Sequence, residues 1–208
     1  AIASGWHLHQ SLVDAEGRNA MLREAPAGAP GDARQVLSDT GAHWLAGLLA
    51  HAPALAAISA PSLNAYARYQ GSVMAPQSAL WGRDNRGAMV RVLGGPGDAG
   101  TRIENRLGEP MANPYLYMAS QVHAGLDGIQ RRLQPPAATD APFAEGGPAL
   151  PTSLDAALDA LDASAVMADA FGPDVIRLLS RIKRSEALRH AQADDKDDWQ
   201  RREYFSRY

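Results

Sequence analysis

Three polar side chains share one face of a short alternating segment near the start of the sequence. Across residues 6–13, His7, His9 and Ser11 fall on every second position, the period typical of a half-buried strand. Neighbours on one face of a strand lie about 6.6–6.8 Å apart, so adjacent side chains can share one ligand. Imidazole binds divalent metal ions, and a hydroxyl suits a phosphate oxygen. The spacing equally suits a strand whose polar side meets water, so that alternative stays open.

A second alternating segment carries charge in the same arrangement. Arg102, Glu104 and Arg106 occupy alternate positions, and Arg86 and Arg91 precede them. Two guanidinium groups beside a carboxylate could hold a metal ion together with a phosphate, which arginine binds bidentately. Four arginines near one glutamate are more typical of anion recognition than of a surface ion pair. A solvated face with salt bridges remains the alternative for this segment taken alone.

Predicted strands and helices must bring these two segments together. Alternation and turn residues predict strands at 6–13, 87–93 and 101–107, with a loop at about 61–77. Capping residues and apolar spacing predict two short helices within residues 43–58 and a helix that begins at Pro114, after the cap Asn113. They also predict a helix after the cap Ser153 and another that contains Val175. Residues 135–151 form a long Pro/Ala/Gly-rich loop. The predicted fold class is α+β in one domain, strand-rich over 1–110 and helical over 111–208.

Apolar stripes mark one face of each predicted helix in the second half of the chain. The stripes are Tyr115/Ala119/Val122/Leu126/Ile129, Leu154/Leu158/Leu161 and Val175/Leu179/Ile182. A stripe of this width usually faces the core. We therefore interpret the last two stripes as core.

Composition and missing motifs exclude several classes of protein. The 208 residues carry a formal charge of −3 and contain no cysteine, which gives no reason to expect nucleic acid or a membrane as partner and rules out disulfides. No apolar run reaches the roughly 20 residues that span a bilayer. The glycine-rich residues 94–97 lack the Lys-Ser/Thr ending of a P-loop, and no Gly-x-Ser-x-Gly elbow is present. The cysteine count fits the cytoplasm.

Taken in order, these segments resemble the glutamine synthetase family. The resemblance is carried by Ser4–Leu12, Asn64–Arg68, Asn85-Arg86, Arg91, Arg102–Arg106, Asn113–Leu116 and Ala124–Ile129. Lys183 with Glu186, and Trp199 with Glu203 and Tyr204, resemble the closing helices of the family. The match runs through the whole chain with the spacing preserved in the central motifs. It implies the C-terminal part of a glutamine synthetase-type catalytic domain, with antiparallel strands whose polar sides face the site.

The family couples ATP to amide formation, so the resemblance implies roles for individual residues. His7 and Glu104 match ligands of a Mg²⁺ or Mn²⁺ ion at the transferred phosphoryl group. The matches to ATP-contacting positions are His9, Ser11, Arg91 and Arg102. Arg68 matches the clamp on the α-carboxylate of glutamate, Arg86 matches the arginine that stabilises the phosphoryl group in transfer, and Arg106 matches one at the reacting carboxylate.

The sequence departs from the family pattern at four places. Ile2-Ala3 replaces a usual Asn-Gly, and Ala99 replaces a nucleotide-contacting lysine. Met74 stands where typical glutamine synthetases have the glutamate that handles ammonium. The small N-terminal β-domain and the paired glutamates that complete the metal sites lie upstream of these residues. We therefore expect the 208 residues to be inactive alone.

These departures favour an ATP-dependent ligase that joins glutamate to a primary amine other than ammonium. The resemblance also implies a homo-oligomeric ring for the complete protein. One alternative is an ordinary glutamine synthetase that uses ammonium, which Met74 opposes. Another is a non-catalytic structural relative, and the retained set His7, Glu104, Arg68, Arg86 and Arg106 opposes it, because a scaffold needs no arginines around one carboxylate.

Overall fold

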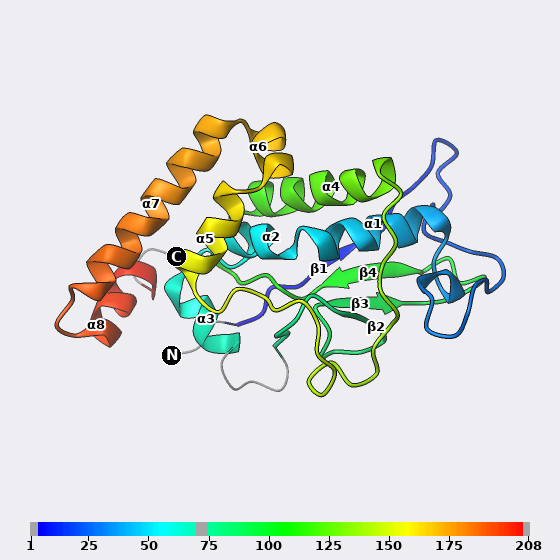
Figure 1. Ribbon diagram of the computed structural model, residues 1–208, viewed down its shortest axis with the longest axis horizontal. Coiled ribbons are helices and arrows are strands. Elements are labelled where there is room, and N and C mark those ends of the chain that lie inside the picture. Colours follow the sequence, from blue (N-terminus) through cyan, green and yellow to red (C-terminus); the bar gives the residue numbers. More distant parts are fainter. Residues whose placement is uncertain (1–3, 70–74, 206–208) are drawn as a thin grey trace.

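The computed structural model describes residues 4–69 and 75–205, and it places a small sheet beside a layer of helices (Figure 1). The strands are β1 (Leu8–Gln10), β2 (Trp81–Arg83), β3 (Val90–Leu93) and β4 (Arg102–Asn105). The helices are α1 (Asp39–Ala50), α2 (Ala52–Ser59), α3 (Leu63–Tyr69), α4 (Pro114–Gln130), α5 (Leu154–Asp162), α6 (Ala165–Phe171), α7 (Pro173–Ala191) and α8 (Lys196–Gln200), with short helical turns at Ala33–Gln35 (η1) and Arg201–Phe205 (η2). The predicted α+β class is confirmed.

The four strands lie in the order β1-β4-β3-β2. As expected, β4 pairs antiparallel with both β1 and β3. The sequence did not predict the strand β2, which pairs parallel with β3. Parallel neighbours usually need a long crossover, but β2 has only three residues, about 10 Å of strand. Residues 84–89 can therefore lead the chain back along β2 to Val90, the start of β3, despite the short connection.

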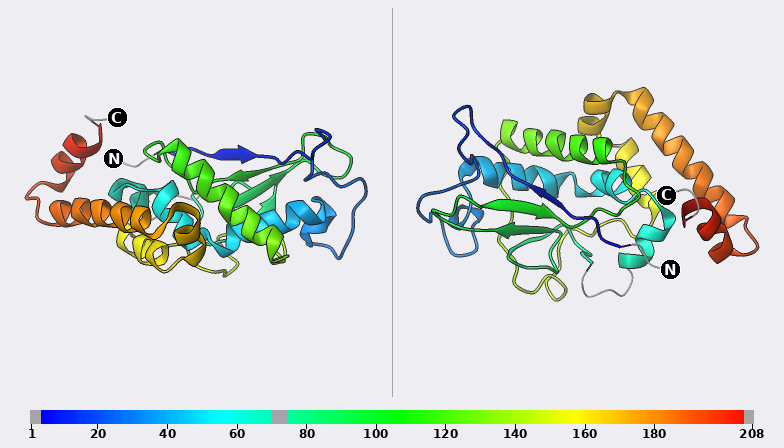
Figure 2. Two further views of the ribbon diagram at one scale, coloured as in Figure 1. Left: turned by 90° about the horizontal axis from the view of Figure 1, so that it is seen from above. Right: turned by 180° about the vertical axis from the view of Figure 1, so that it is seen from behind.

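One face of the sheet is buried against α1 and α4, which lie side by side (Figure 2). Val90, Val92 and Ile103 are fully buried on this face. Polar residues of the same face form hydrogen bonds with the helices: Trp44 Nε1 donates to Gln10 Oε1 at 3.0 Å, and Asn105 Nδ2 donates to Gln121 Oε1 at 2.6 Å. Because side chains alternate along a strand, this packing leaves the other face to the predicted site residues.

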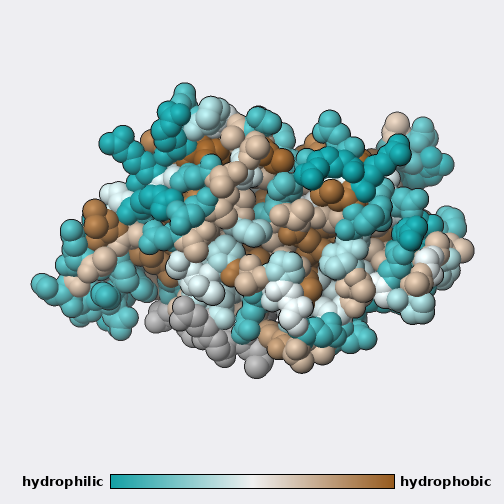
Figure 3. Space-filling view, viewed as in Figure 1, coloured by the Kyte–Doolittle hydropathy of each residue, from teal (hydrophilic) through white to brown (hydrophobic). Residues whose placement is uncertain are grey.

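Helices α1 and α4 pack backbone to backbone through glycines. A Cβ atom on Gly47 would lie 2.1 Å from the carbonyl oxygen of Ala124, and one on Gly128 would lie 2.1 Å from that of His43. So close a contact buries the small residues of α4. The stripe predicted on this helix consequently faces outward at Tyr115, Val122 and Leu126. Apolar surface is visible over α4 and over the α6–α7 end of the molecule (Figure 3).

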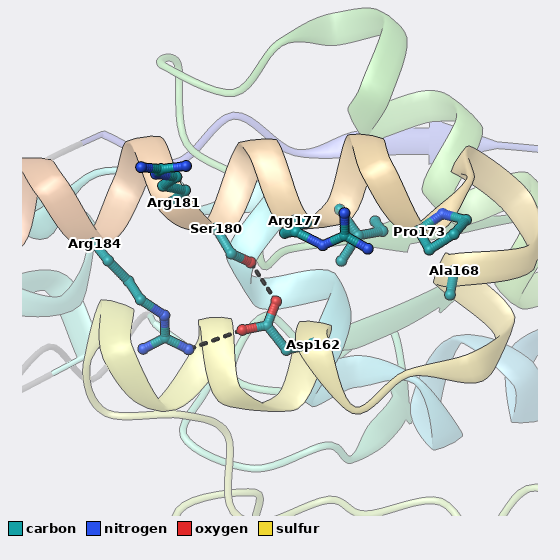
Figure 4. A pocket seen from close by; sticks show the side chains of 8 residues that line it. Asp162, Ala168, Pro173, Arg177, Ser180, Arg181 and Arg184 are labelled. Carbon is teal, nitrogen blue, oxygen red and sulfur yellow. Dashed lines mark hydrogen bonds and ion pairs between the residues drawn. The ribbon is translucent and has the colours of Figure 1, made fainter.

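Helix α7 departs from prediction in a similar way. Of its predicted core stripe, Val175 and Ile182 are exposed, whereas Leu154, Leu158 and Leu161 of α5 are buried as expected. The seam between α5 and α7 is polar: Ser180 Oγ donates to Asp162 Oδ1 at 2.5 Å, and Arg184 Nη2 donates to Asp162 Oδ2 at 3.0 Å (Figure 4). Arg184 also donates to Asp159 at 2.7 Å. A hydrogen-bonded interface needs no apolar stripe, so the stripe of α7 does not identify its packed face.

One helix falls within the loop predicted at about 61–77, and one strand that was not predicted lies just beyond it. Helix α3 begins after Ser62, whose hydroxyl accepts the amide of Ala65 at 3.1 Å, and β2 begins at Trp81. The predicted loop at 135–151 is free of helices and strands, apart from an isolated bridge between Ser78 and Ala149.

Within the described residues, only α1 and α2 taken together approach the length and apolarity of a membrane span, and they meet at a bend of 74°.

Candidate active site

The polar face of the sheet brings the two predicted segments together around Glu104. In the strand register, Glu104 of β4 lies between His9 of β1 and Arg91 of β3. His7 Nδ1 lies 3.1 Å from Glu104 Oε1, and His9 Nε2 lies 3.8 Å from the same oxygen. Alternation predicted which side chains share a face on each strand, and the register brings His9 and Glu104 together.

Each oxygen of the Glu104 carboxylate accepts a hydrogen bond from an arginine. Arg106 Nη1 donates to Oε1 at 2.8 Å, and Arg91 Nη1 donates to Oε2 at 3.2 Å. The side chains of Glu104 and Arg106 are 4% and 6% exposed, so this is a buried ion pair and not a solvated salt-bridge face. The alternative left open for the charged segment is therefore excluded.

Burial and neighbouring charge set the protonation of this cluster. Burial acts to raise the pKa of Glu104, but the charge of Arg106, the hydrogen bond from Arg91 and the two imidazoles outweigh it and lower that pKa. Burial and the charge of Arg106 lower the pKa of His7, against the opposing effect of Glu104. At neutral pH the site therefore presents a carboxylate and a neutral imidazole, the forms in which both groups bind metal ions.

The remaining predicted phosphate and nucleotide residues flank this cluster on two sides. Arg86 and Arg91 line an open hollow of about 440 Å³ together with Arg83, Asp84 and Asn85. Ser11 lies beside Ala99 in a second hollow of about 740 Å³. Arg102 Nε donates to His9 Nδ1 at 3.3 Å and so lies between the cluster and the Ser11 side.

Arg68 lies apart from these side chains, against the backbone that follows β4. Its guanidinium group donates to the carbonyl oxygens of Arg106, Leu107 and Gly108 at 2.9–3.1 Å and to that of Ser4 at 3.2 Å. The residue is 7% exposed. Its predicted role as a clamp on the α-carboxylate of glutamate stays a prediction, and the structure adds a firm attachment of α3 to residues 106–108.

A model of the family described as "Glutamine synthetase, catalytic domain" matches residues 1–204. The chain belongs to the glutamine synthetase family. It is 40% identical over 216 residues to a γ-glutamylanilide synthase of Acinetobacter sp, an alignment that covers 99% of this chain and 42% of that protein. A γ-glutamylethanolamide synthetase of Streptomyces coelicolor is 37% identical, with 97% and 41% covered, and a glutamine synthetase of Methanococcus maripaludis is 34% identical, with 97% and 45% covered.

Solved structures agree with this assignment. The structure described as a GmaS/ADP complex superposes with a TM-score of 0.77 at 31% identity, covering 97% of this chain and 46% of that one. Apo GmaS gives 0.75. The expected glutamine synthetase-type fold is thus confirmed. The chain spans less than half the length of the relatives it matches.

The glutamine synthetase family uses a divalent metal ion, and the donor set here fits part of such a site. His7 and Glu104 offer nitrogen and oxygen donors 3.1 Å apart. Within residues 4–69 and 75–205, however, no group of three or more histidine or acidic side chains is arranged to hold a metal ion. The two predicted ligands therefore suit half of a site.

Weak metal binding follows for the 208 residues alone. Catalytic sites usually supply about three protein ligands, and His7 and Glu104 supply two. Titration calorimetry with Mn²⁺ should accordingly show weak binding, with a dissociation constant above roughly 10 µM, and His7→Ala should abolish it. A nanomolar site that His7→Ala removes would contradict the half-site interpretation.

Two predicted features of this family member lie outside the described residues: Met74 and the Ile2-Ala3 departure. Conversely, the sequence analysis did not single out Asp84. The carboxylate of Asp84 accepts hydrogen bonds from Nε and Nη2 of Arg91, and the bond from Nε is 2.8 Å long. The signal available was an acidic residue within the arginine-rich segment 83–91. It missed Glu109 as well, because the partner of this buried carboxylate is Ser62, 47 residues away.

Proposed function

We propose that the complete protein joins the γ-carboxylate of glutamate to an amine, with ATP as the source of energy. The observation that carries the proposal is the ionised Glu104 held between His7, Arg91 and Arg106 on one face of the sheet. Two relatives support the proposal, because they are named for the synthesis of γ-glutamyl amides, an anilide and an ethanolamide. The GmaS structure with ADP supports nucleotide use.

The proposed reaction has two steps. A γ-carboxylate oxygen of glutamate attacks the γ-phosphorus of ATP, the bond to the bridging oxygen breaks, and ADP leaves with that electron pair. The amine nitrogen then attacks the acyl carbon, the bond from that carbon to the phosphate oxygen breaks, and phosphate leaves. The nitrogen gives up a proton as the amide forms.

The chain supplies fixed positive charge where this reaction develops negative charge. Arg86 and Arg91 line one hollow, where Arg86 would stabilise the transferred phosphoryl group and Arg91 would contact ATP. Arg106 would orient the reacting carboxylate. His9, Ser11 and Arg102 would contact ATP on the other side. A Mg²⁺ or Mn²⁺ ion bound by His7 and Glu104 would neutralise charge on the phosphoryl oxygens.

Met74 favours a primary amine over ammonium as the acceptor. A carboxylate at this position can hold ammonium by charge, accept its hydrogen bonds and remove its proton. Methionine offers a weak acceptor and an apolar stem. Losing one charged hydrogen bond costs about 1.5–3 kcal/mol, and each methylene buried against methionine contributes about 0.8 kcal/mol. An amine with two to four carbons therefore roughly offsets the loss, which ammonium cannot do.

The complete protein should prefer its best alkyl or aryl amine to ammonium by about tenfold or more in kcat/KM. Phosphate release with glutamate, ATP and a panel of amines measures this preference. Met74→Glu should narrow the gap towards ammonium, and Met74→Leu, which stays apolar, should preserve it. If ammonium matches the best amine in the panel, the protein is an ordinary glutamine synthetase in which another acid replaces the missing one.

The assembly and location of the complete protein follow from the family resemblance. We expect a homo-oligomeric ring in the cytoplasm. Size measurement on the complete protein tests the ring. The 208 residues alone should show no ligase activity, since they supply half of the proposed metal site.

A further inference from the structure

A chain of buried polar contacts connects the C-terminal segment to the start of α3. The amide of Leu63 donates to the Tyr204 hydroxyl at 3.2 Å, and this hydroxyl donates to Glu186 Oε2 at 3.4 Å. Lys183 Nζ holds both oxygens of Glu186 at 2.9 and 3.0 Å. Tyr204 is 2% exposed, so its hydroxyl is a fixed partner of α3 and not a surface contact.

A second contact attaches the same end of α3 to the segment after β4. Glu109 is fully buried, and its two carboxylate oxygens accept the amide and the hydroxyl of Ser62 at 2.9 and 3.0 Å. The amide of Glu109 donates to the carbonyl of Ser59 at 2.9 Å. The Tyr204 contact is made by Leu63, the first residue of α3, and the Glu109 carboxylate contact by Ser62, the residue before it, so together they fix where this helix begins.

The far end of α3 is attached to the neighbouring residues of that segment. Arg68 donates to the carbonyls of residues 106–108, and the Tyr69 hydroxyl donates to Leu107 O at 2.6 Å. The backbone held in this way carries Arg106, which contacts Glu104 and His7. Displacement of α3 would therefore move Arg68 and Arg106 together. The start of the β1 segment shares this attachment through Ser4, whereas Ser11 lies beyond Leu8–Gln10, which pair with β4.

From these contacts we infer that Tyr204 is a positioning residue for the glutamate side of the site, acting through α3. The inference rests on the proposed function. It gives a role to the C-terminal residues, although α7 lies at the end of the molecule away from the sheet (Figure 1). Glu203 reinforces the arrangement, because Arg189 of α7 holds its carboxylate at 2.9 and 3.1 Å.

Tyr204→Phe in the complete protein tests this role by removing one hydroxyl. The KM for glutamate should rise about three- to tenfold, with the KM for ATP within about twofold of the wild type. Amide exchange across residues 63–69 should accelerate, because the amide of Leu63 loses its acceptor. Glu109→Gln, which weakens the second contact, should likewise raise the KM for glutamate and leave the KM for ATP within about twofold of the wild type.

Ser180→Ala is the matched control, because it removes a buried hydroxyl from α7 that bonds Asp162 and not α3 (Figure 4). It should leave both KM values unchanged. An unchanged KM for glutamate in Tyr204→Phe overturns the inference, whatever the exchange result. Equal increases for glutamate and ATP, or the same glutamate effect in Ser180→Ala, overturn it too. A wild-type protein that does not consume glutamate would contradict the proposed function instead.

Discussion

Glu104→Gln in the complete protein should lower kcat for amide formation by on the order of a hundredfold or more. The substitution keeps the volume of the side chain but removes its charge, while Arg91 and Arg106 keep theirs. A proposed metal ligand is lost as well, because a carboxamide binds divalent cations far less well than a carboxylate. Both effects fall on the phosphoryl-transfer step. Steady-state phosphate release at saturating glutamate, ATP and amine measures the change.

The same substitution should destabilise the fold. Removing one partner of a buried ion pair costs about 3–5 kcal/mol, because the remaining charge stays buried without compensation. Asp39→Asn is a suitable control, because Asp39 is an exposed carboxylate that pairs with Arg23. An exposed ion pair of this kind contributes about 1 kcal/mol or less to stability. Activity should be compared at a temperature at which both variants are folded. A Glu104→Gln protein with wild-type kcat would remove Glu104 from the site.

Arg68→Lys should lower kcat/KM for glutamate about ten- to hundredfold and change the KM for ATP little. Lysine keeps the charge but presents its donors from one atom, so it cannot bind a carboxylate bidentately. The cost of that lost geometry is about 1.5–3 kcal/mol. Lysine also cannot reach the carbonyls of residues 106–108 together, so the melting temperature should fall.

Arg102→Lys provides the opposite control, because Arg102 contacts His9 on the predicted ATP side. It should raise the KM for ATP and leave the KM for glutamate little changed. Together the two variants separate the two ends of the proposed site. Unchanged kcat and KM for glutamate in Arg68→Lys would show that Arg68 serves only to hold the backbone.

Local alternation predicted the polar face of each strand, and the family resemblance predicted that these faces belong to one site. Strand period alone placed His7 and His9 on one face, and Glu104 with Arg106 on another strand, and the register brings these faces together. Such a prediction succeeds because side-chain direction in a strand depends only on position along the chain. The prediction of a loop at 61–77 failed at residues 63–69, because the cap at Ser62 is completed by Glu109, a contact between distant segments.

Periodicity identified α4, α5 and α7, and it gave the buried face of α5 but not those of α4 and α7. The apolar stripe of α4 is exposed at Tyr115 and Leu126 because close packing against Gly47 selects the glycine face instead. On α7 the buried positions include Ser180 and Glu186, which are satisfied by Asp162 and Lys183. Packing by backbone approach and by polar pairs leaves no apolar signal, so neither face could be predicted from hydrophobic spacing.

Transfer of isotope from glutamate to phosphate tests the central claim most directly. The complete protein would be given ATP, an amine and glutamate labelled with ¹⁸O in its γ-carboxylate, and the phosphate released would be analysed by mass spectrometry. Attack by the γ-carboxylate on ATP predicts one ¹⁸O in each phosphate, formed in equal amount with a γ-glutamyl amide. Unlabelled phosphate, or phosphate released at the same rate without glutamate, would contradict the proposed ligase.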